Sequence, residues 1–298
     1  MKSTDMKAVV REGGLARIAR VPRPDAPAGW VSLRVLLAGI CRTDLYAADG
    51  ALPVEEGRIL GHELVGELDG GGRATVSPII PCAACSACRS GLRCLSPRML
   101  GVGVDGGFAE YVVVPEACVH PVPRELPLRR AAYVEPVAAS LAVVRAPIER
   151  GQRGLVLGHG RITSLTARVL EARGFSRLTT SDVGAPLEEG AFDFVIETAA
   201  TSDVLDAALR AVRPGGVVVL KSRPPQRTPL DVARAVQKDV TLAAVSYASF
   251  EESIALVAEL PVDDLLGDSF PLERFAAAFA RAREPGSPKL FLTLEGGA

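Results

Sequence analysis

Four of the six cysteines of this chain lie within thirteen residues, at Cys82, Cys85, Cys88 and Cys94. Four thiolates with the spacing C-x2-C-x2-C-x5-C suit a closed, tetrahedral zinc site of the structural kind. The segment is also rich in turn-forming residues, so packing alone would not hold its shape. We therefore predict a zinc site here. Four free thiols in a loop, or a redox-active C-x-x-C pair, are the alternatives.

The rest of the composition excludes several classes of protein. A disulfide framework would spread its cysteines over a small secreted domain, whereas this chain has 298 residues and no N-terminal export signal. We therefore expect a cytoplasmic protein. The net charge of -1 gives no basic footprint for nucleic acid, and no apolar run is long enough to span a membrane. A hydrophobic fraction of 48% with 23% charged residues is typical of a folded chain.

The pattern of the chain changes near residue 150. Before it, short β-like runs alternate with glycine and proline. From Gly151 a buried-strand run, RGLVLG, precedes an amphipathic helix with Ile162, Leu165, Val169 and Leu170 on one face. Strand-like LTTSD and FDFVIET, a helix DVLDAALRAV and the strand RPGGVVVL follow. This alternation predicts an α/β fold with a doubly wound parallel sheet. The chain ends with a helix, LERFAAAFARARE, and a strand, PKLFLTLE.

The first strand of this sheet is followed by a candidate nucleotide loop. Gly158 and Gly160 lie between the strand and its helix, where glycines let a pyrophosphate approach the helix N-terminus. The third position of this fingerprint is Thr163 instead of glycine, which predicts a helix slightly farther from the strand. Asp182 ends the next strand, where a carboxylate can hold the ribose hydroxyls of NAD, and no arginine follows to bind the 2′-phosphate of NADP. The alternative is an ordinary strand–turn–helix with a surface aspartate.

A second group of residues could form an open zinc site. Cys41, His62, Glu63 and Glu135 supply a thiolate, an imidazole and two carboxylates, with a position left for water or substrate. Asp44 could fix the tautomer of His62. Thr43 could bind a metal-bound alcohol and begin the outward path of its proton. On spacing alone, a buried cysteine and a satisfied histidine remain the default alternative.

Segments along nearly the whole chain resemble the zinc-dependent medium-chain dehydrogenases, the alcohol and sorbitol dehydrogenase superfamily. The resemblance implies a GroES-like catalytic domain at residues 1–145, which includes the zinc segment 82–94, a shortened Rossmann domain at 146–264, and a return to the catalytic domain at 265–298. It covers, in order, GICRTD, GHELVG, the four-cysteine segment, GGFAEYVVVP, VEPVAASL, LGHG, VRPGGVVVL, FPLERFAAAF and KLFLT.

The resemblance also implies roles for individual residues. Cys41 and His62 match catalytic zinc ligands, and Glu63 and Glu135 match carboxylates that bind that zinc directly or through water. Thr43 matches the hydroxyl that contacts the substrate oxygen. Arg42 matches a residue that contacts the pyrophosphate of the cofactor. The structural zinc site of the family is matched by Cys82, Cys85, Cys88 and Cys94. Lys289 matches a basic position to which we assign no role.

The chain also departs from the family pattern. Tyr46 stands where many relatives end the proton relay with a histidine, and the segment after Asp182 omits a helix and a strand. This trimmed form, with GHG in the phosphate loop, resembles the bacteriochlorophyllide a dehydrogenases of the same superfamily, which suggests a biosynthetic role.

Together these features predict an oxidoreductase with two zinc ions that transfers hydride between a secondary alcohol or carbonyl compound and NAD(H). We expect a homodimer, joined through RPGGVVVL as an edge strand, with no nucleic-acid or membrane partner. The alternatives are a zinc-independent reductase of conjugated C=C bonds, such as enoyl thioesters, and a non-catalytic binding protein derived from this fold.

Overall fold

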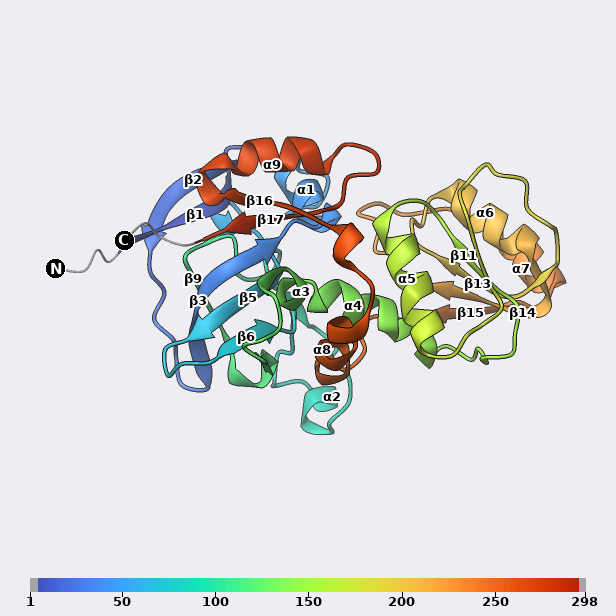
Figure 1. Ribbon diagram of the computed structural model, residues 1–298, viewed down its shortest axis with the longest axis horizontal. Coiled ribbons are helices and arrows are strands. Elements are labelled where there is room, and N and C mark those ends of the chain that lie inside the picture. The colour runs from blue at the N-terminus through green and yellow to red at the C-terminus, as the bar shows by residue number, and fades with distance from the viewer. Residues whose placement is uncertain (1–4, 295–298) are drawn as a thin grey trace. The chain divides into compact units, whose positions relative to one another are not determined.

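The computed structural model describes residues 5–294, which fall into two compact units. One unit contains the chain up to Glu135 and again from Leu266, and the other is Pro136–Leu265 (Figure 1). The three domain ranges that the family resemblance implies stay a prediction. No helix within residues 5–294 is long and apolar enough to cross a membrane.

The first unit is built on a seven-stranded sheet of order β10-β6-β5-β3-β17-β16, with β9 also paired to β3. Strand β3 is buried along its second half and runs antiparallel to both β5 and β17. The end of β3 therefore lies beside the starts of both neighbours, which brings residues far apart in sequence to one end of the sheet. The strands are β3 (Trp30–Gly39), β5 (Glu63–Leu68), β6 (Arg73–Val76), β9 (Tyr111–Pro115), β10 (Val119–Val122), β16 (Leu266–Pro271) and β17 (Lys289–Thr293).

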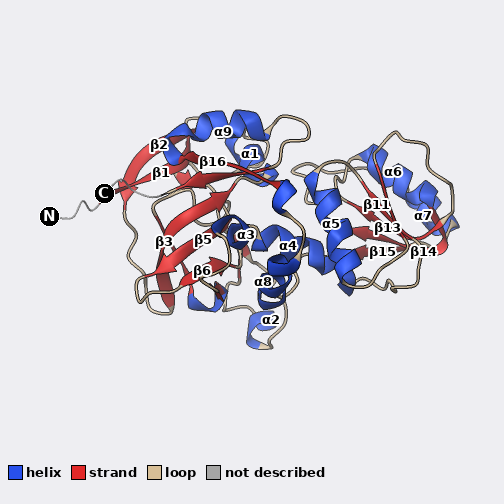
Figure 2. Ribbon diagram, in the orientation of Figure 1, coloured by secondary structure: helices blue, strands red, loops and turns tan. Residues whose placement is uncertain are grey.

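Smaller elements complete this unit. They are a three-stranded sheet of order β2-β1-β4, the strand pair β7–β8 and several short helices. Figure 2 shows the short helices in blue beside the strands in red. The predicted helix LERFAAAFARARE begins as a 3-10 turn after Pro271 and becomes α-helical at Phe275. The elements are β1 (Asp5–Glu12), β2 (Leu15–Pro22), β4 (Arg58–Ile59), β7 (Ile79–Ile80), β8 (Arg98–Met99), α1 (Arg42–Ala48), α2 (Ser86–Arg89), α3 (Leu128–Ala132), α9 (Phe275–Ala282), η1 (Glu116–Cys118) and η4 (Leu272–Arg274). Helix α4 (Val134–Leu141) carries the chain into the second unit.

The second unit contains the predicted parallel sheet, with strand order β12-β11-β13-β14-β15. Successive residues of each buried strand face opposite sides, so Leu155 and Leu157 pack with α6 and α7, whereas Val156 packs with α5. The elements are β11 (Gly154–Leu157), α5 (Arg161–Ala172), β12 (Leu178–Ser181), β13 (Phe192–Glu197), α6 (Ser202–Ala211), β14 (Val212–Leu220), α7 (Val232–Gln237), β15 (Thr241–Ala244), α8 (Phe250–Glu259), η2 (Ala142–Arg145) and η3 (Asp263–Leu265).

Two features of this sheet bear on the expectations from sequence. No helix or strand lies between β12 and β13 in the described chain, as the shortened segment after Asp182 predicted. The expectation that RPGGVVVL forms the sheet edge was wrong, because β14 lies between β13 and β15. The edge strand β15 is short and only partly apolar, so its sequence, TLAA, gave little sign of a strand.

Candidate functional site

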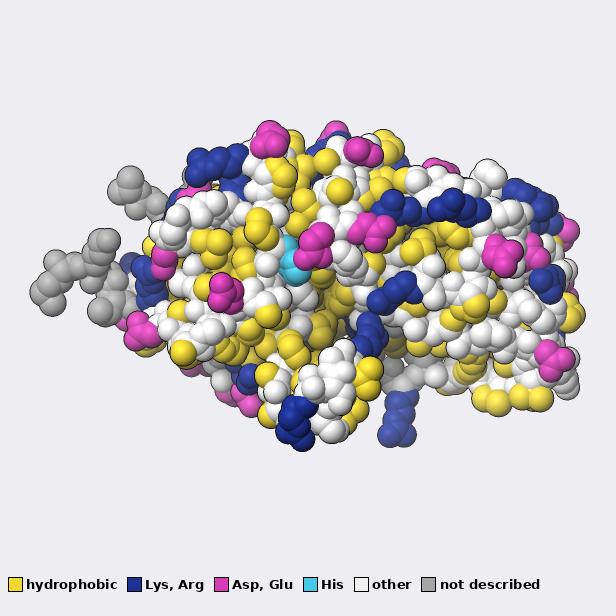
Figure 3. Space-filling model, turned by 90° about the horizontal axis from the view of Figure 1, so that it is seen from below, with side chains coloured by type: hydrophobic (Ala, Val, Ile, Leu, Met, Phe, Trp, Pro, Cys, Tyr) yellow, Lys and Arg dark blue, Asp and Glu magenta, His cyan; other side chains and the backbone are white. Residues whose placement is uncertain are grey.

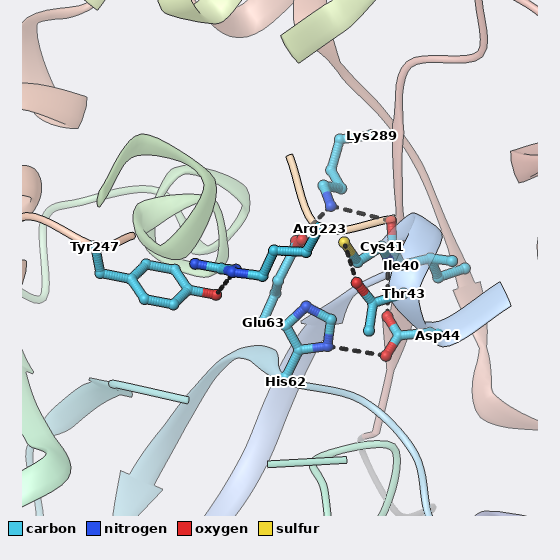
Figure 4. Close-up of polar contacts among 9 residues, drawn as sticks. All are labelled: Ile40, Cys41, Thr43, Asp44, His62, Glu63, Arg223, Tyr247 and Lys289. Atoms are coloured by element: carbon cyan, nitrogen blue, oxygen red, sulfur yellow. Dashed lines mark hydrogen bonds and ion pairs between the residues drawn. The ribbon is translucent and has the colours of Figure 1, made fainter. Parts of the chain in front are cut away.

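The main candidate site lies where β3 ends beside the starts of β5 and β17. Glu63, the first residue of β5, is the register partner of Gly39 at the end of β3. Lys289 is the first residue of β17, and Cys41 follows β3 as the N-cap of α1. The antiparallel pairing of three strands thus places these side chains together (Figure 4).

Asp44 organises the part of this site that α1 supplies. Its Oδ2 accepts a hydrogen bond from the Cys41 backbone N–H at 2.8 Å, which caps the helix. Its Oδ1 lies 3.0 Å from His62 Nδ1, and both side chains are buried. Cys41 Sγ and Thr43 Oγ1 are 3.8 Å apart. The carboxylate therefore holds both the backbone before the helix and the orientation of the imidazole; its role in fixing the tautomer of His62 stays a prediction.

The electrostatics of His62 show that the cluster favours a positive charge. Burial lowers the pKa of His62, but the negative charges of Asp44 and Cys41 and their hydrogen bonds outweigh it, so the pKa is raised well above its ordinary value. A cation among these residues would replace the proton as their countercharge.

Glu63 also belongs to a buried ion pair. Its Oε2 forms an ion pair with Lys289 Nζ, and each side chain is only 1% exposed. Lys289 Nζ also donates to the Ile40 carbonyl oxygen at 3.0 Å. A Cβ on Gly39 would lie 2.6 Å from Glu63 Oε2, so a glycine is needed for the pair to fit. Lys289 thus has a role that sequence analysis did not assign.

Three of the predicted ligands come together in the structure. The ligand atoms of Cys41, His62 and Glu63 all lie within 4.8 Å of one another. One thiolate, one imidazole and one carboxylate are the donor types that zinc prefers, so these residues fit a zinc ion. Glu135 is buried near the start of α4 but is not in this group. Arg42 is exposed at the start of α1, and Tyr46 is half-buried on the same helix.

The four clustered cysteines form a second group whose sulfur atoms all lie within 4.8 Å. Backbone N–H groups donate to sulfur: Cys82 N to Cys94 Sγ at 3.2 Å, Cys85 N to Cys82 Sγ at 3.4 Å, and Cys88 N to Cys85 Sγ at 3.4 Å. Backbone hydrogen bonds from Leu95 and Cys88 lower the pKa of Cys85 to about 6, whereas the hydrogen bond with Cys85 and burial raise the pKa of Cys88 to about 12. Four thiols this close favour ionisation together only beside a cation, so the group fits a structural zinc.

The nucleotide loop has the expected strand–glycine–helix context. Gly158 and Gly160 have φ of +139° and +82°, and a Cβ on Gly158 would lie 2.1 Å from Thr198 Oγ1. Thr163, at the third fingerprint position, is buried on α5 and its hydroxyl lies 2.8 Å from Thr198 Oγ1. Asp182 follows β12 and is exposed. The glycine loop before α5 and the Asp182 carboxylate after β12 therefore fit a dinucleotide.

One buried residue was missed by sequence analysis. Glu197, at the end of β13, is fully buried and accepts hydrogen bonds from four backbone N–H groups. The sequence feature that could have indicated it is an acidic residue at the end of the largely apolar run FDFVIE.

This chain is similar in sequence and in fold to several known proteins. Residues 27–124 match the family described as the alcohol dehydrogenase GroES-like domain. D-altritol 5-dehydrogenase of Agrobacterium fabrum is 36% identical over 63% of this chain and 61% of its own length. Sorbitol dehydrogenase of Bacillus subtilis is 28% identical over 93% of this chain and 94% of its own length. A zinc-binding dehydrogenase from Sinorhizobium meliloti, bound to NADP, has a TM-score of 0.87 at 24% identity and covers 98% of this chain and 100% of its own.

Proposed function

We propose that this chain is a medium-chain dehydrogenase of the alcohol and sorbitol dehydrogenase type, that it is zinc-dependent, and that it uses NAD(H) to oxidise a secondary alcohol or reduce the corresponding ketone. The family match over residues 27–124 and the similarity to D-altritol and sorbitol dehydrogenases support this proposal. The observation that carries the zinc dependence is the group Cys41, His62 and Glu63, whose ligand atoms all lie within 4.8 Å. A reductase of conjugated C=C bonds stabilises an enolate and has no need of these ligands.

In this proposal Cys41, His62 and Glu63 would hold the zinc, and Glu135 would support it through water. Asp44 keeps a proton on His62 Nδ1 and so leaves Nε2 as the ligand. When bound, zinc lowers the pKa of a coordinated substrate hydroxyl and polarises a carbonyl in the reverse direction. NAD, when bound, would supply the acceptor for the hydride of the carbinol carbon.

The proton of the substrate hydroxyl leaves through this chain's own groups. The Thr43 hydroxyl, beside the Cys41 sulfur, accepts it first. Tyr46 lies three residues farther along α1, on the neighbouring position of the same helix face, and passes the proton on towards solvent. Tyr46 thus takes the place of the histidine that ends the relay in many relatives.

We propose that the cofactor is NAD, with the pyrophosphate at Gly158–Gly160 and at Arg42 and the adenosine ribose at Asp182. The carboxylate of Asp182 would repel a 2′-phosphate, and the segment Val183–Pro186 offers no arginine to bind one. The Sinorhizobium meliloti neighbour holds NADP, so a comparison of the two cofactors tests this choice directly.

We further propose a biosynthetic role, a cytoplasmic location, where thiolate ligands stay reduced, and a homodimer. The biosynthetic role rests on the trimmed sequence pattern. The dimer is supported by the edge strand β15, which has one neighbour in the described sheet. On the face shown in Figure 3, basic and acidic side chains are interspersed. Such a face offers no basic patch for a nucleic acid, so we propose a small-molecule partner.

The test is the substitution Cys41→Ser, with Cys118→Ala as its control. Cys118 is buried in the apolar core and belongs to neither ligand group. We expect about two zinc ions per wild-type chain and about one in Cys41→Ser. Turnover of secondary alcohols should fall at least about a thousandfold, because the metal contributes several kcal/mol to the barrier. NADH binding should be nearly unchanged, and Cys118→Ala should keep both zinc ions.

Three results would contradict the proposal. Equal turnover in Cys41→Ser would exclude the zinc mechanism, and metal-independent reduction of enoyl thioesters would favour the C=C reductase. Absence of NADH fluorescence enhancement at millimolar cofactor would favour a non-catalytic binding protein.

A further inference from the structure

Glu197 is a fully buried carboxylate that accepts hydrogen bonds from four backbone N–H groups. Its Oε2 accepts from Ala199 N at 3.0 Å and from Ala200 N at 2.8 Å, in the loop after β13. Its Oε1 accepts from Lys221 N and Ser222 N, both at 2.7 Å, in the loop after β14. Short bonds to an ionised acceptor are the strong ones, so this side chain holds two loops against each other.

These loops lie at the edge where an open parallel sheet binds its ligand. The chain leaves β11 for β12 on one side, and β13 lies on the other side, so the sheet has its topological switch point there. Thr198 links the two sides, because its Oγ1 donates to the Leu157 carbonyl at 3.1 Å and lies 2.8 Å from the Thr163 hydroxyl. The loop that Glu197 holds is therefore continuous with the nucleotide loop.

The same edge is tied together farther out. Arg223, next to Ser222, donates from Nη1 to the Tyr247 hydroxyl and from Nη2 to Ser246 Oγ, each at 3.0 Å. Its guanidinium lies 4.5 Å from the centre of the Tyr247 ring (Figure 4). Four loops, after β11, β13, β14 and β15, are thus linked in sequence, and Glu197 is the buried link between the second and the third.

We propose that Glu197 is a positioning residue for the nicotinamide half of the cofactor; this rests on the proposed function. With the pyrophosphate at Gly158–Gly160 and the adenosine at Asp182 on the β12 side, the nicotinamide half lies on the other side of the switch point, at the loops after β13 and β14. Glu197 does not touch the cofactor. It acts through the backbone of residues 199–200 and 221–222, which it fixes before the cofactor binds.

The test compares NADH with ADP-ribose, which lacks the nicotinamide, in the variant Glu197→Gln. Glutamine keeps one acceptor oxygen, and its amide nitrogen faces two backbone N–H donors, so one loop loses its anchor. We expect the Kd for NADH to rise about tenfold or more, the equivalent of one or two strong hydrogen bonds, and the Kd for ADP-ribose to change less than about twofold.

The matched control is Asp193→Asn, near the start of the same strand. Asp193 also accepts a backbone hydrogen bond, from Arg153 N at 2.7 Å, and one from Arg213 Nε at 2.7 Å, but at the opposite edge of the sheet. This control should lower the melting temperature and leave both affinities unchanged. If Glu197 has a purely structural role, Glu197→Gln should behave like the control, or it should weaken the binding of NADH and ADP-ribose by the same factor. Either outcome overturns the proposal.

A second measurement needs no variant and applies if Glu197→Gln does not fold. In the wild-type protein, NADH should slow amide hydrogen exchange in residues 199–200 and 221–222, whereas ADP-ribose should not. Equal protection by the two ligands overturns the assignment. If the wild-type protein binds neither ligand, the proposed function itself fails before the variant is measured, and the assignment fails with it.

Discussion

At the scale of single residues, the buried ion pair of Glu63 and Lys289 determines how the candidate zinc site is charged. Both side chains are almost fully excluded from solvent, and the lysine is also held by the Ile40 carbonyl. Breaking a buried pair leaves one charge without compensation, which costs far more than loss of an exposed pair. The carboxylate of Glu63 therefore depends on Lys289, on a metal ion, or on both.

We predict that Lys289→Met destabilises the metal-free protein by about 3–5 kcal/mol, because Glu63 is then buried without a countercharge. With zinc bound the loss should be smaller, since the ion supplies positive charge to the same carboxylate. Thermal unfolding with and without zinc measures both values.

The exposed pair of Lys7 and Glu273 is the control for this prediction. Their side chains are 36% and 54% exposed, so Lys7→Met should cost at most about 1 kcal/mol with or without zinc. An equal loss from both substitutions would show that Glu63 has other compensation.

At the scale of elements, strand β13 is fixed by a carboxylate at each end. Near its start, the hydrogen bond from Arg213 and that from the Arg153 backbone N–H hold the pKa of Asp193 below its ordinary value. This stabilisation is present above the unfolded-state pKa of about 3.9 and is lost as the pH falls through the lower folded-state pKa.

We predict that Asp193→Asn lowers the free energy of unfolding by about 1 kcal/mol at pH 7. The wild-type protein and the variant should converge in stability as the pH falls below about 3.9, because protonated Asp193 no longer gains from its partners. Urea denaturation at pH 7, 5 and 3 measures the difference. A difference that does not change with pH would mean that the carboxylate charge is not what stabilises the strand.

The elements themselves could be predicted from local pattern. The run RGLVLG and the helix with Leu165, Val169 and Leu170 on one face have the periods of a buried strand and an amphipathic helix, and the structure has both. The internal position of β14 in the sheet could not be predicted, because it depends on whether the short segment Thr241–Ala244 pairs beyond it. Strand neighbours are a tertiary property, and a short strand has a weak local signal.

Some residues of the candidate site could likewise be predicted from local sequence, and others could not. Cys41, His62 and Glu63 lie in short motifs whose residue types indicate metal binding, so their grouping could be anticipated. The partner of Glu63 could not, because Lys289 reaches it only through the pairing of β17 with β3. Glu197 was missed for a related reason, since its partners are backbone N–H groups, which carry no residue identity.

At the scale of the whole molecule, the exposed apolar residues of the second unit bear on the proposed dimer. Val232 and Val236, one turn apart on α7, are 62% and 70% exposed, and Leu242 on the edge strand β15 is 38% exposed. An edge strand with exposed backbone groups and apolar neighbours is a ready site for pairing with a second copy. A two-fold arrangement would pair β15 with its own copy as antiparallel strands and join the two parallel sheets across the subunits.

We predict that the wild-type protein is a dimer and that the pair Val236→Glu and Leu242→Lys converts it to a monomer, because charges at a self-complementary surface are placed against each other and must be desolvated. Sedimentation over a range of protein concentrations measures the change. Leu92→Glu is the matched control, since Leu92 is as exposed as Val236 but lies in the four-cysteine segment of the other unit. A wild-type protein that is monomeric at all concentrations would exclude the dimer. Dissociation by Leu92→Glu alone would place the interface outside α7 and β15.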